Sequence, residues 1–174
     1  MKNRTCRMTA LSLALATLMG CATTASIPTS SPALAAAIGQ LEAGQPREAA
    51  IALEAQAASL RGAARSQALA DAAWAWHLAG DSARAQSLLT QLTARQLTGT
   101  SVQRHALLQA ELANAAGQPA QALGWLANQA VIHAPLQARW QLASAAAQEA
   151  SGDGFAAAAA LARTATKRGD PRAQ

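Results

Sequence analysis

The chain has 174 residues, which is enough for one domain with a sizeable core. Hydrophobic residues make up 51% of it, yet most of them are alanine, with a single Phe and no Tyr, a composition that favours closely packed helices. Three of the 14 basic residues lie within the first seven positions, and the other 11 are nearly balanced by 9 acidic residues. No basic stripe with interleaved aromatic residues remains, which argues against a nucleic-acid-binding protein.

Residues 1–20 have the organisation of a bacterial export signal. Lys2, Arg4 and Arg7 precede an uncharged stretch, residues 8–20, which ends directly before Cys21. This stretch holds 13 residues, whereas a membrane-spanning helix needs about 20. The sequence therefore predicts a cleaved signal peptide and not a transmembrane anchor.

The four residues Leu18-Met19-Gly20-Cys21 resemble the lipobox of bacterial lipoproteins. In that motif the cysteine thiol takes a diacylglyceryl group and becomes the first mature residue, so we expect lipidation at Cys21. Several acyl chains on one residue give durable membrane anchoring. Ala22 follows the cysteine where an Asp would resemble an inner-membrane retention signal, which favours the outer membrane. A plain secretory signal with an incidental cysteine is the alternative.

A short linker follows the cysteine. Residues 21–32 are rich in Ser, Thr and Pro and are typical of a flexible tether that holds the folded part away from the bilayer. The other cysteine, Cys6, lies within the signal, so the mature chain has no pair of thiols for a disulfide. We therefore expect the domain at residues 33–168 to be stable through packing alone, with residues 169–174 as a tail.

Four similar segments follow one another along the domain. Their glycines are spaced by 36, 37 and 35 residues, close to the period of about 34 in tetratricopeptide repeats. An alanine lies seven residues before each glycine, another alanine five residues after it, and a leucine nine residues after it. The glycines are Gly44, Gly80, Gly117 and Gly152. Generic alanine-rich helices with glycines in register by chance are the alternative.

Each of these glycines is expected to end one helix, and the Gln, Asp or Pro that follows is expected to open the next. The sequence therefore predicts an all-α protein, a tetratricopeptide-like solenoid of about four helical hairpins that form a right-handed superhelix. The leucine of each segment should fill the space between two helices that approach closely through their alanines. The expected helices are 32–43, 46–61, 63–79, 82–96, 101–116, 119–130, 135–151 and 154–168.

Residues that could carry chemistry are few. His77, His105 and His133 have no second ligand at metal-binding spacing, so no metal or cofactor is predicted. The carboxylates are scattered over different repeats, and Asp81 and Asp153 are better explained as helix N-caps. No nucleophile elbow or phosphate-binding loop occurs. The sequence predicts a protein that is not an enzyme.

Large aromatic and charged side chains are the remaining candidates for partner contact, namely Trp74, Trp76, Trp125 and Arg139. Trp74 and Trp76 point about 200 degrees apart on one helix, so we expect one of them to be partly exposed. Packing between successive repeats is the alternative explanation for the tryptophans, Trp140 included.

Two stretches carry a family resemblance. LLQAELANAAGQPAQALGWL and PLQARWQLASAAAQEASGDGFAAAA, with Ala138, Arg139 and Trp140, resemble the N-terminal tetratricopeptide-like region of penicillin-binding-protein activator lipoproteins of the LpoA/LppC type. The resemblance covers the lipobox and residues 33–168. It implies an outer-membrane lipoprotein that stimulates a class A penicillin-binding protein in peptidoglycan synthesis by binding it.

Members of that family also carry a C-terminal domain similar to periplasmic substrate-binding proteins, and this sequence ends at Gln174, where that domain would begin. A truncated form of such an activator is therefore one expectation. The alternatives are a general tetratricopeptide-like lipoprotein scaffold in outer-membrane protein, pilus or secretion-complex assembly, and an enzyme acting on the cell wall. The enzyme would need acids or a nucleophile clustered on one face.

Overall fold

The computed structural model describes residues 31–127 and 131–168, and these are all-helical, as the composition predicts. Cys21 and most of the tether, like the tail at 169–174, lie outside the described residues. The described part contains eight α-helices, one 3-10 helix and no strand. The helices are α1 (Pro32–Glu42), α2 (Pro46–Ser59), α3 (Gly62–Leu78), α4 (Ser82–Leu89), η1 (Ala94–Gln96), α5 (Gly99–Ala115), α6 (Pro119–Leu126), α7 (Ala134–Ala150) and α8 (Gly154–Arg168).

Glycine turns separate the helices of each pair, as predicted. Gly80 has a φ of 87°, a backbone conformation that residues with a side chain rarely adopt. Its N–H donates to the carbonyl of His77 and the following N–H donates to the carbonyl of Trp76, so the last carbonyls of α3 are satisfied. The Asp81 carboxylate then accepts from the Arg84 N–H at 2.9 Å and caps α4. Asp153 accepts from the Ala156 N–H in the same way, which confirms both predicted N-caps.

Two helices end earlier than the sequence predicts. The helix expected at 82–96 stops at Leu89, and the next residues form a connection and the short η1. Ser66 of α3 holds this connection, because its hydroxyl accepts from the Thr93 N–H and donates to the Gln96 side chain. A tertiary contact therefore overrides the local helical pattern. The helix expected at 119–130 ends at Leu126, and residues 128–130 lie outside the described part.

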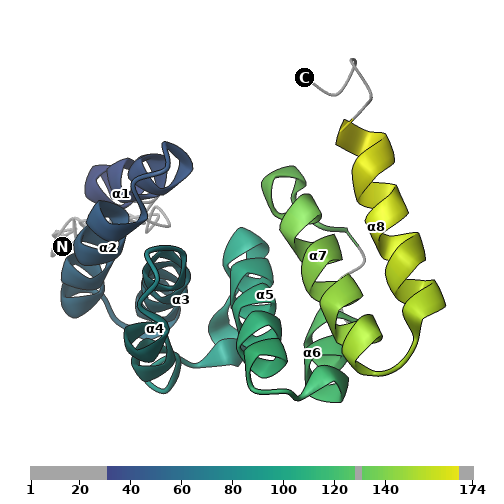
Figure 1. The fold of residues 1–174 in the computed structure, drawn as a ribbon. Helices are drawn as coiled ribbons and strands as arrows, with labels where there is room; N and C mark the ends of the chain where they lie inside the picture. The colour runs from purple at the N-terminus through teal and green to yellow at the C-terminus, as the bar shows by residue number, and fades with distance from the viewer. Residues whose placement is uncertain (1–30, 128–130, 169–174) are drawn as a thin grey trace, which may run out of the picture.

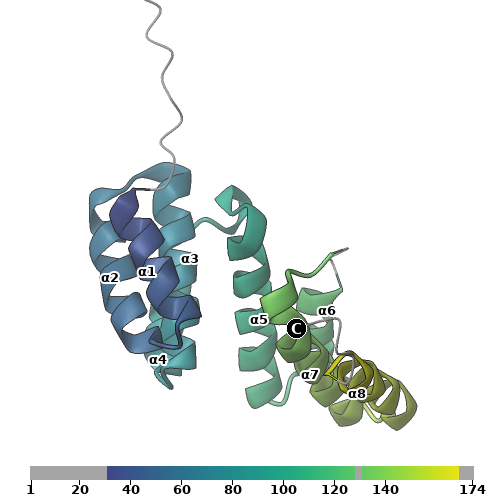
Figure 2. The same cartoon turned by 90° about the horizontal axis from the view of Figure 1, so that it is seen from above.

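The helices follow an arc (Figure 1). Consecutive helices pack against each other from α1 to α4 and again from α5 to α8. The short η1 lies between these two groups in the chain, and contacts of α3 with α5 join the groups in space. Contacts of α1 with α3, α3 with α5, and α5 with α7 align these four helices along the inner side of the arc. Seen from above, the helix pairs turn progressively along the chain (Figure 2).

The core follows the repeat positions closely. All eight alanines of the pattern are buried: Ala37, Ala49, Ala73, Ala85, Ala110, Ala122, Ala145 and Ala157. Leu53 and Leu126 are buried between helices, whereas Leu89 is only partly buried and its neighbour Leu88 is buried instead. Leu161 is 45% exposed, so the expected packing role is wrong there. The reason is that α8 packs against α7, and no further helix covers its other side in the part of the chain that the structure describes.

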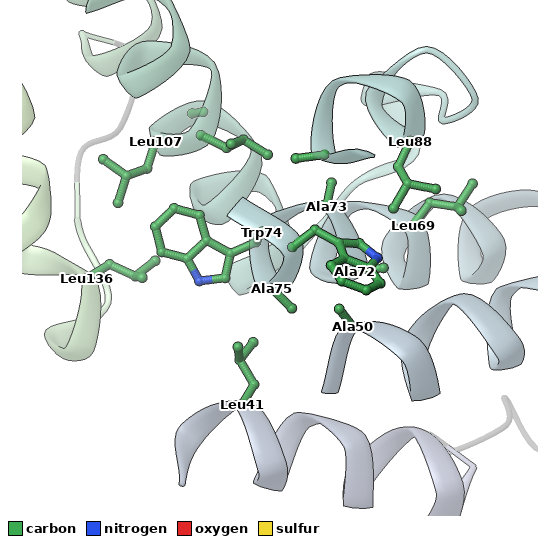
Figure 3. Close-up of a cluster of buried hydrophobic side chains, with 14 of the residues drawn as sticks. Leu41, Ala50, Leu69, Ala72, Ala73, Trp74, Ala75, Leu88, Leu107 and Leu136 are labelled. Carbon is green, nitrogen blue, oxygen red and sulfur yellow. The ribbon is translucent and has the colours of Figure 1, made fainter. Parts of the chain in front are cut away.

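Trp74 and Trp76 are both buried, each 3% exposed, so the expectation that one would be partly exposed is wrong. The physical reason is that α3 contacts α1, α2, α4, α5 and η1, so that neighbouring elements cover the faces that carry both indoles. Trp74 lies among Leu41, Leu107 and Leu136, which come from three other helices (Figure 3). Trp76 lies beneath the guanidinium of Arg84, 4.2 Å from its ring centroid.

The glycine turns lead to a first prediction. Gly80→Ala should lower the free energy of unfolding by about 1–2 kcal/mol, because alanine resists the positive φ. Gly124→Ala is the matched control: Gly124 lies within α6, has no positive φ, and nothing lies within 4 Å of an added Cβ. This variant should be stabilised by about 0.5–1 kcal/mol through helix propensity. Urea unfolding followed by circular dichroism measures the free energy of unfolding of both variants. The same change in Gly80→Ala and Gly124→Ala would contradict the turn assignment.

Candidate functional site

The inner side of the arc is hollowed at two neighbouring places. The first hollow, of about 520 Å³, lies between α1, α3 and α5, and its lining includes Leu34, Ala35, Ile38, Gln67, Thr98 and Ser101. The second, of about 270 Å³, reaches α7, and its lining includes Leu41, Trp74, Leu78, Pro135, Leu136 and Arg139. Glu42 and Arg104 line both hollows, so the two meet at these side chains. We call the two hollows together the inner groove.

A buried ion pair forms the floor where the hollows meet. Arg104 of α5 donates from Nη1 to the Asp71 carboxylate of α3 at 2.9 Å, and the Ser101 hydroxyl donates to the same carboxylate. Asp71 is 7% exposed, and this burial raises its pKa, while Arg104 and Ser101 oppose the rise. The pair fixes α3 to α5 and holds the Arg104 guanidinium at the groove.

A second polar cluster joins three of the inner helices. His77 Nε2 of α3 lies 2.6 Å from Glu111 Oε2 of α5, and Arg139 of α7 donates to both carboxylate oxygens of Glu111, at 2.6 and 2.7 Å. Burial tends to raise the pKa of Glu111, but the hydrogen bonds from His77 and Arg139 outweigh this effect and lower it. The cluster therefore holds an ionised carboxylate and aligns α3, α5 and α7.

His77 thus has hydrogen-bond partners that the sequence did not reveal. Its Nδ1 lies 3.2 Å from the Ser82 hydroxyl, so Ser82, His77 and Glu111 form a hydrogen-bonded row of hydroxyl, imidazole and carboxylate. Such a row can move a proton, but Arg139 occupies both oxygens of the carboxylate, and neither Ser82 nor His77 is among the residues that line the inner groove. The row acts as a structural link between α3, α4 and α5.

Of the four candidates for partner contact, Trp74 and Arg139 lie together. The Arg139 guanidinium lies 5.2 Å from the Trp74 ring centroid, and its side chain is 43% exposed at the second hollow. Trp76 is buried on the side of α3 that faces Arg84. Trp125 is partly buried on α6 and contacts the edge of His105, whose pKa is lowered by its burial.

Sequence reasoning missed the central residues of the groove, Glu42, Asp71 and Arg104. A signal for the ion pair was present: Asp71 is the one charged residue in the stretch SQALADAAWAW, and Arg104 follows it by 33 residues, close to one repeat. Within residues 31–127 and 131–168, no three His, Cys, Asp or Glu side chains are grouped to hold a metal ion. None of the described helices is long and apolar enough to cross a membrane.

Comparison of the chain with protein-family models, with curated proteins and with solved structures finds no match.

The buried ion pair gives a second prediction. Arg104→Met should lower the free energy of unfolding by about 3–5 kcal/mol, because it leaves the Asp71 carboxylate buried without its counter-charge. The double variant Asp71→Leu/Arg104→Met removes both charges and should recover most of this loss. Chemical denaturation of the single and double variants measures the coupling. If the double variant instead lost more free energy of unfolding than Arg104→Met alone, the two side chains would not be coupled.

Proposed function

We propose that this protein is a non-catalytic binding protein, a tetratricopeptide-like solenoid whose inner groove holds a segment of a partner protein. The observation that carries the proposal is the groove itself, which runs across α1, α3, α5 and α7 and combines apolar walls with a few fixed polar groups. Stacked helical hairpins form extended concave surfaces of this kind. The two polar clusters between the helices keep the groove in shape before a partner arrives, which lowers the cost of binding.

The partner we propose is a class A penicillin-binding protein, which this chain would activate in peptidoglycan synthesis. Support for this choice comes from the resemblance of residues 107–126 and 135–159 to activator lipoproteins. Within the second stretch, Arg139 lies at the second hollow and Trp140 is buried in the core. The chain would be held at the periplasmic face of the outer membrane by lipid on Cys21, with residues 21–32 as the tether.

A general scaffold for envelope assembly is the second candidate. The groove favours it equally, because nothing in the geometry is specific for a synthase, and the two functions differ only in the partner. An assembly scaffold would bind outer-membrane, pilus or secretion components and leave the synthase alone. Measurement with a purified synthase separates the two candidates.

Lipid anchoring leads to a third prediction. Cys21→Ser removes the thiol that would be acylated, so the protein should move from the membrane fraction to the soluble periplasmic fraction in a bacterial host. Cys6→Ser is the matched control, because Cys6 precedes the expected cleavage site and should leave fractionation unchanged. Retention of the Cys21→Ser protein in membranes would contradict the lipobox assignment.

Synthase binding leads to a fourth prediction. The mature chain with Cys21→Ser should bind a purified class A synthase and raise its glycan-polymerising or cross-linking rate. Ala35→Trp should weaken this binding at least severalfold, because Ala35 is exposed and lines the first hollow. Ala36→Trp is the matched control, since Ala36 is exposed on the same helix and lies outside the groove lining. Surface plasmon resonance and a lipid II polymerisation assay measure the two effects.

Two outcomes would count against this proposal. Absence of both binding and stimulation would remove the synthase as the partner of this chain. Equal effects of Ala35→Trp and Ala36→Trp would show that the synthase binds elsewhere on the surface.

A further inference from the structure

Unused hydrogen-bonding capacity lies at the point where the two hollows meet. The Arg104 side chain is nine-tenths buried and uses Nη1 for Asp71, while its Nε is buried without a partner. Guanidinium groups carry five N–H donors and no acceptor. Nε itself is enclosed, but Arg104 lines both hollows, so a ligand oxygen that reaches one of the other N–H donors of this guanidinium would be favoured.

Glu42 provides the opposite chemistry beside it. Its residue is exposed, it lines both hollows, and its carboxylate has no ion pair or hydrogen bond with the described part of the chain. It is also the last residue of α1, where the helix dipole places partial negative charge. Both features favour a positively charged group at this position.

The other charges at the groove compensate one another. Asp71 pairs with Arg104, and Glu111 pairs with Arg139. The remaining titratable residue of the lining is His133, which lies directly before α7. Glu42 is therefore the lining charge without a counter-charge in the described part of the chain.

An apolar recess adjoins these polar groups. Leu41, Leu78 and Leu136 surround it, and Trp74 lies between Leu41 and Leu136 (Figure 3). Pro135 completes the wall on the side of α7. The recess, at about 270 Å³, accommodates one aliphatic side chain beside the charged position.

We propose that the inner groove binds an extended segment of the partner in which a lysine or arginine lies next to an aliphatic residue. The basic side chain pairs with Glu42, a backbone carbonyl of the segment accepts from the Arg104 guanidinium, and the aliphatic side chain fills the recess at Trp74. An extended segment suits the groove because its backbone offers a free carbonyl at every residue. This inference rests on the proposed binding function and names the chemistry of the segment that the groove selects.

Short acetylated and amidated peptides with one variable residue between two leucines test the inference directly. With lysine, glutamine or glutamate at that residue, affinity for the mature Cys21→Ser chain should fall in this order. The lysine peptide should bind about two- to fivefold more tightly than the glutamine peptide at low salt, the size expected of a partly exposed ion pair. The preference should disappear at high salt because the pair is screened. Fluorescence anisotropy measures all three peptides.

Three variants and one control separate the contributions of Glu42 and Arg104. Glu42→Gln should abolish the preference for lysine over glutamine, and Glu42→Lys should reverse it toward glutamate. Glu149→Gln is the matched control, since Glu149 is exposed on α7 outside the groove lining and its loss should leave the preference intact. Arg104→Lys keeps the charge beside Asp71 but offers fewer donors, so it should weaken all three peptides by a similar factor. Circular dichroism establishes that each variant is folded.

The results distinguish this inference from the proposed function. Binding of none of the peptides at millimolar concentration, or a preference unaffected by Glu42→Gln, would overturn the inference. If the synthase binds through the groove while the peptides show no lysine preference, the function stands and the segment chemistry is wrong. If the lysine preference is present while the synthase does not bind, the groove chemistry stands and the partner is another protein.

Discussion

Enclosure of α3 by its neighbours is the constraint on which the rest of the fold depends. Ten of its residues, between Ser66 and Trp76, are buried, and five of them are alanine. Alanine brings helix axes close together, since no long side chain separates them, and the two indoles then fill the wider spaces on opposite sides. A helix covered in this way cannot shift without disturbing α1, α2, α4 and α5 together. The inner groove lies directly above this fixed helix, so its shape is set by the core.

Polar links between repeats complete this arrangement. An alanine-rich contact surface is smooth because it lacks long side chains. It therefore fixes the position and rotation of one helix against the next only weakly. Two polar clusters supply directional bonds at defined positions along α3, α5 and α7. One is Asp71 with Arg104, and the other is Glu111 with His77 and Arg139. Removing one member of such a cluster costs more than the cluster contributes overall, because the remaining charge stays buried. The clusters are therefore weak evidence for a gain in total stability, and we infer that they mainly fix how the helices pack.

The local features of the fold were predictable, and the long-range ones were not. Gly80 and Asp81 could be assigned because a left-handed turn and an N-cap depend on neighbouring residues alone. The end of α4 at Leu89 depends on Ser66 of α3, and the burial of both Trp74 and Trp76 depends on how many helices surround α3. The ion pairs join residues 28 to 34 positions apart, a separation that differs from the spacing of the glycines because the paired residues occupy different positions within their repeats. Arg139 was singled out as a rare charged group, whereas the structure gives it a defined place beside Trp74.

The proposed function combines a preorganised groove with contacts to the partner that are individually weak. One partly exposed ion pair, one hydrogen bond and one filled recess give modest affinity, even when the groove is preorganised. A chain fixed to the membrane by lipid on Cys21 would meet its partner in a thin layer of the periplasm, where a short tether keeps the effective concentration high. Modest affinity would then suffice for occupancy and would allow rapid exchange. The proposed anchor would in this sense complement the groove, since a high effective concentration compensates for weak individual contacts.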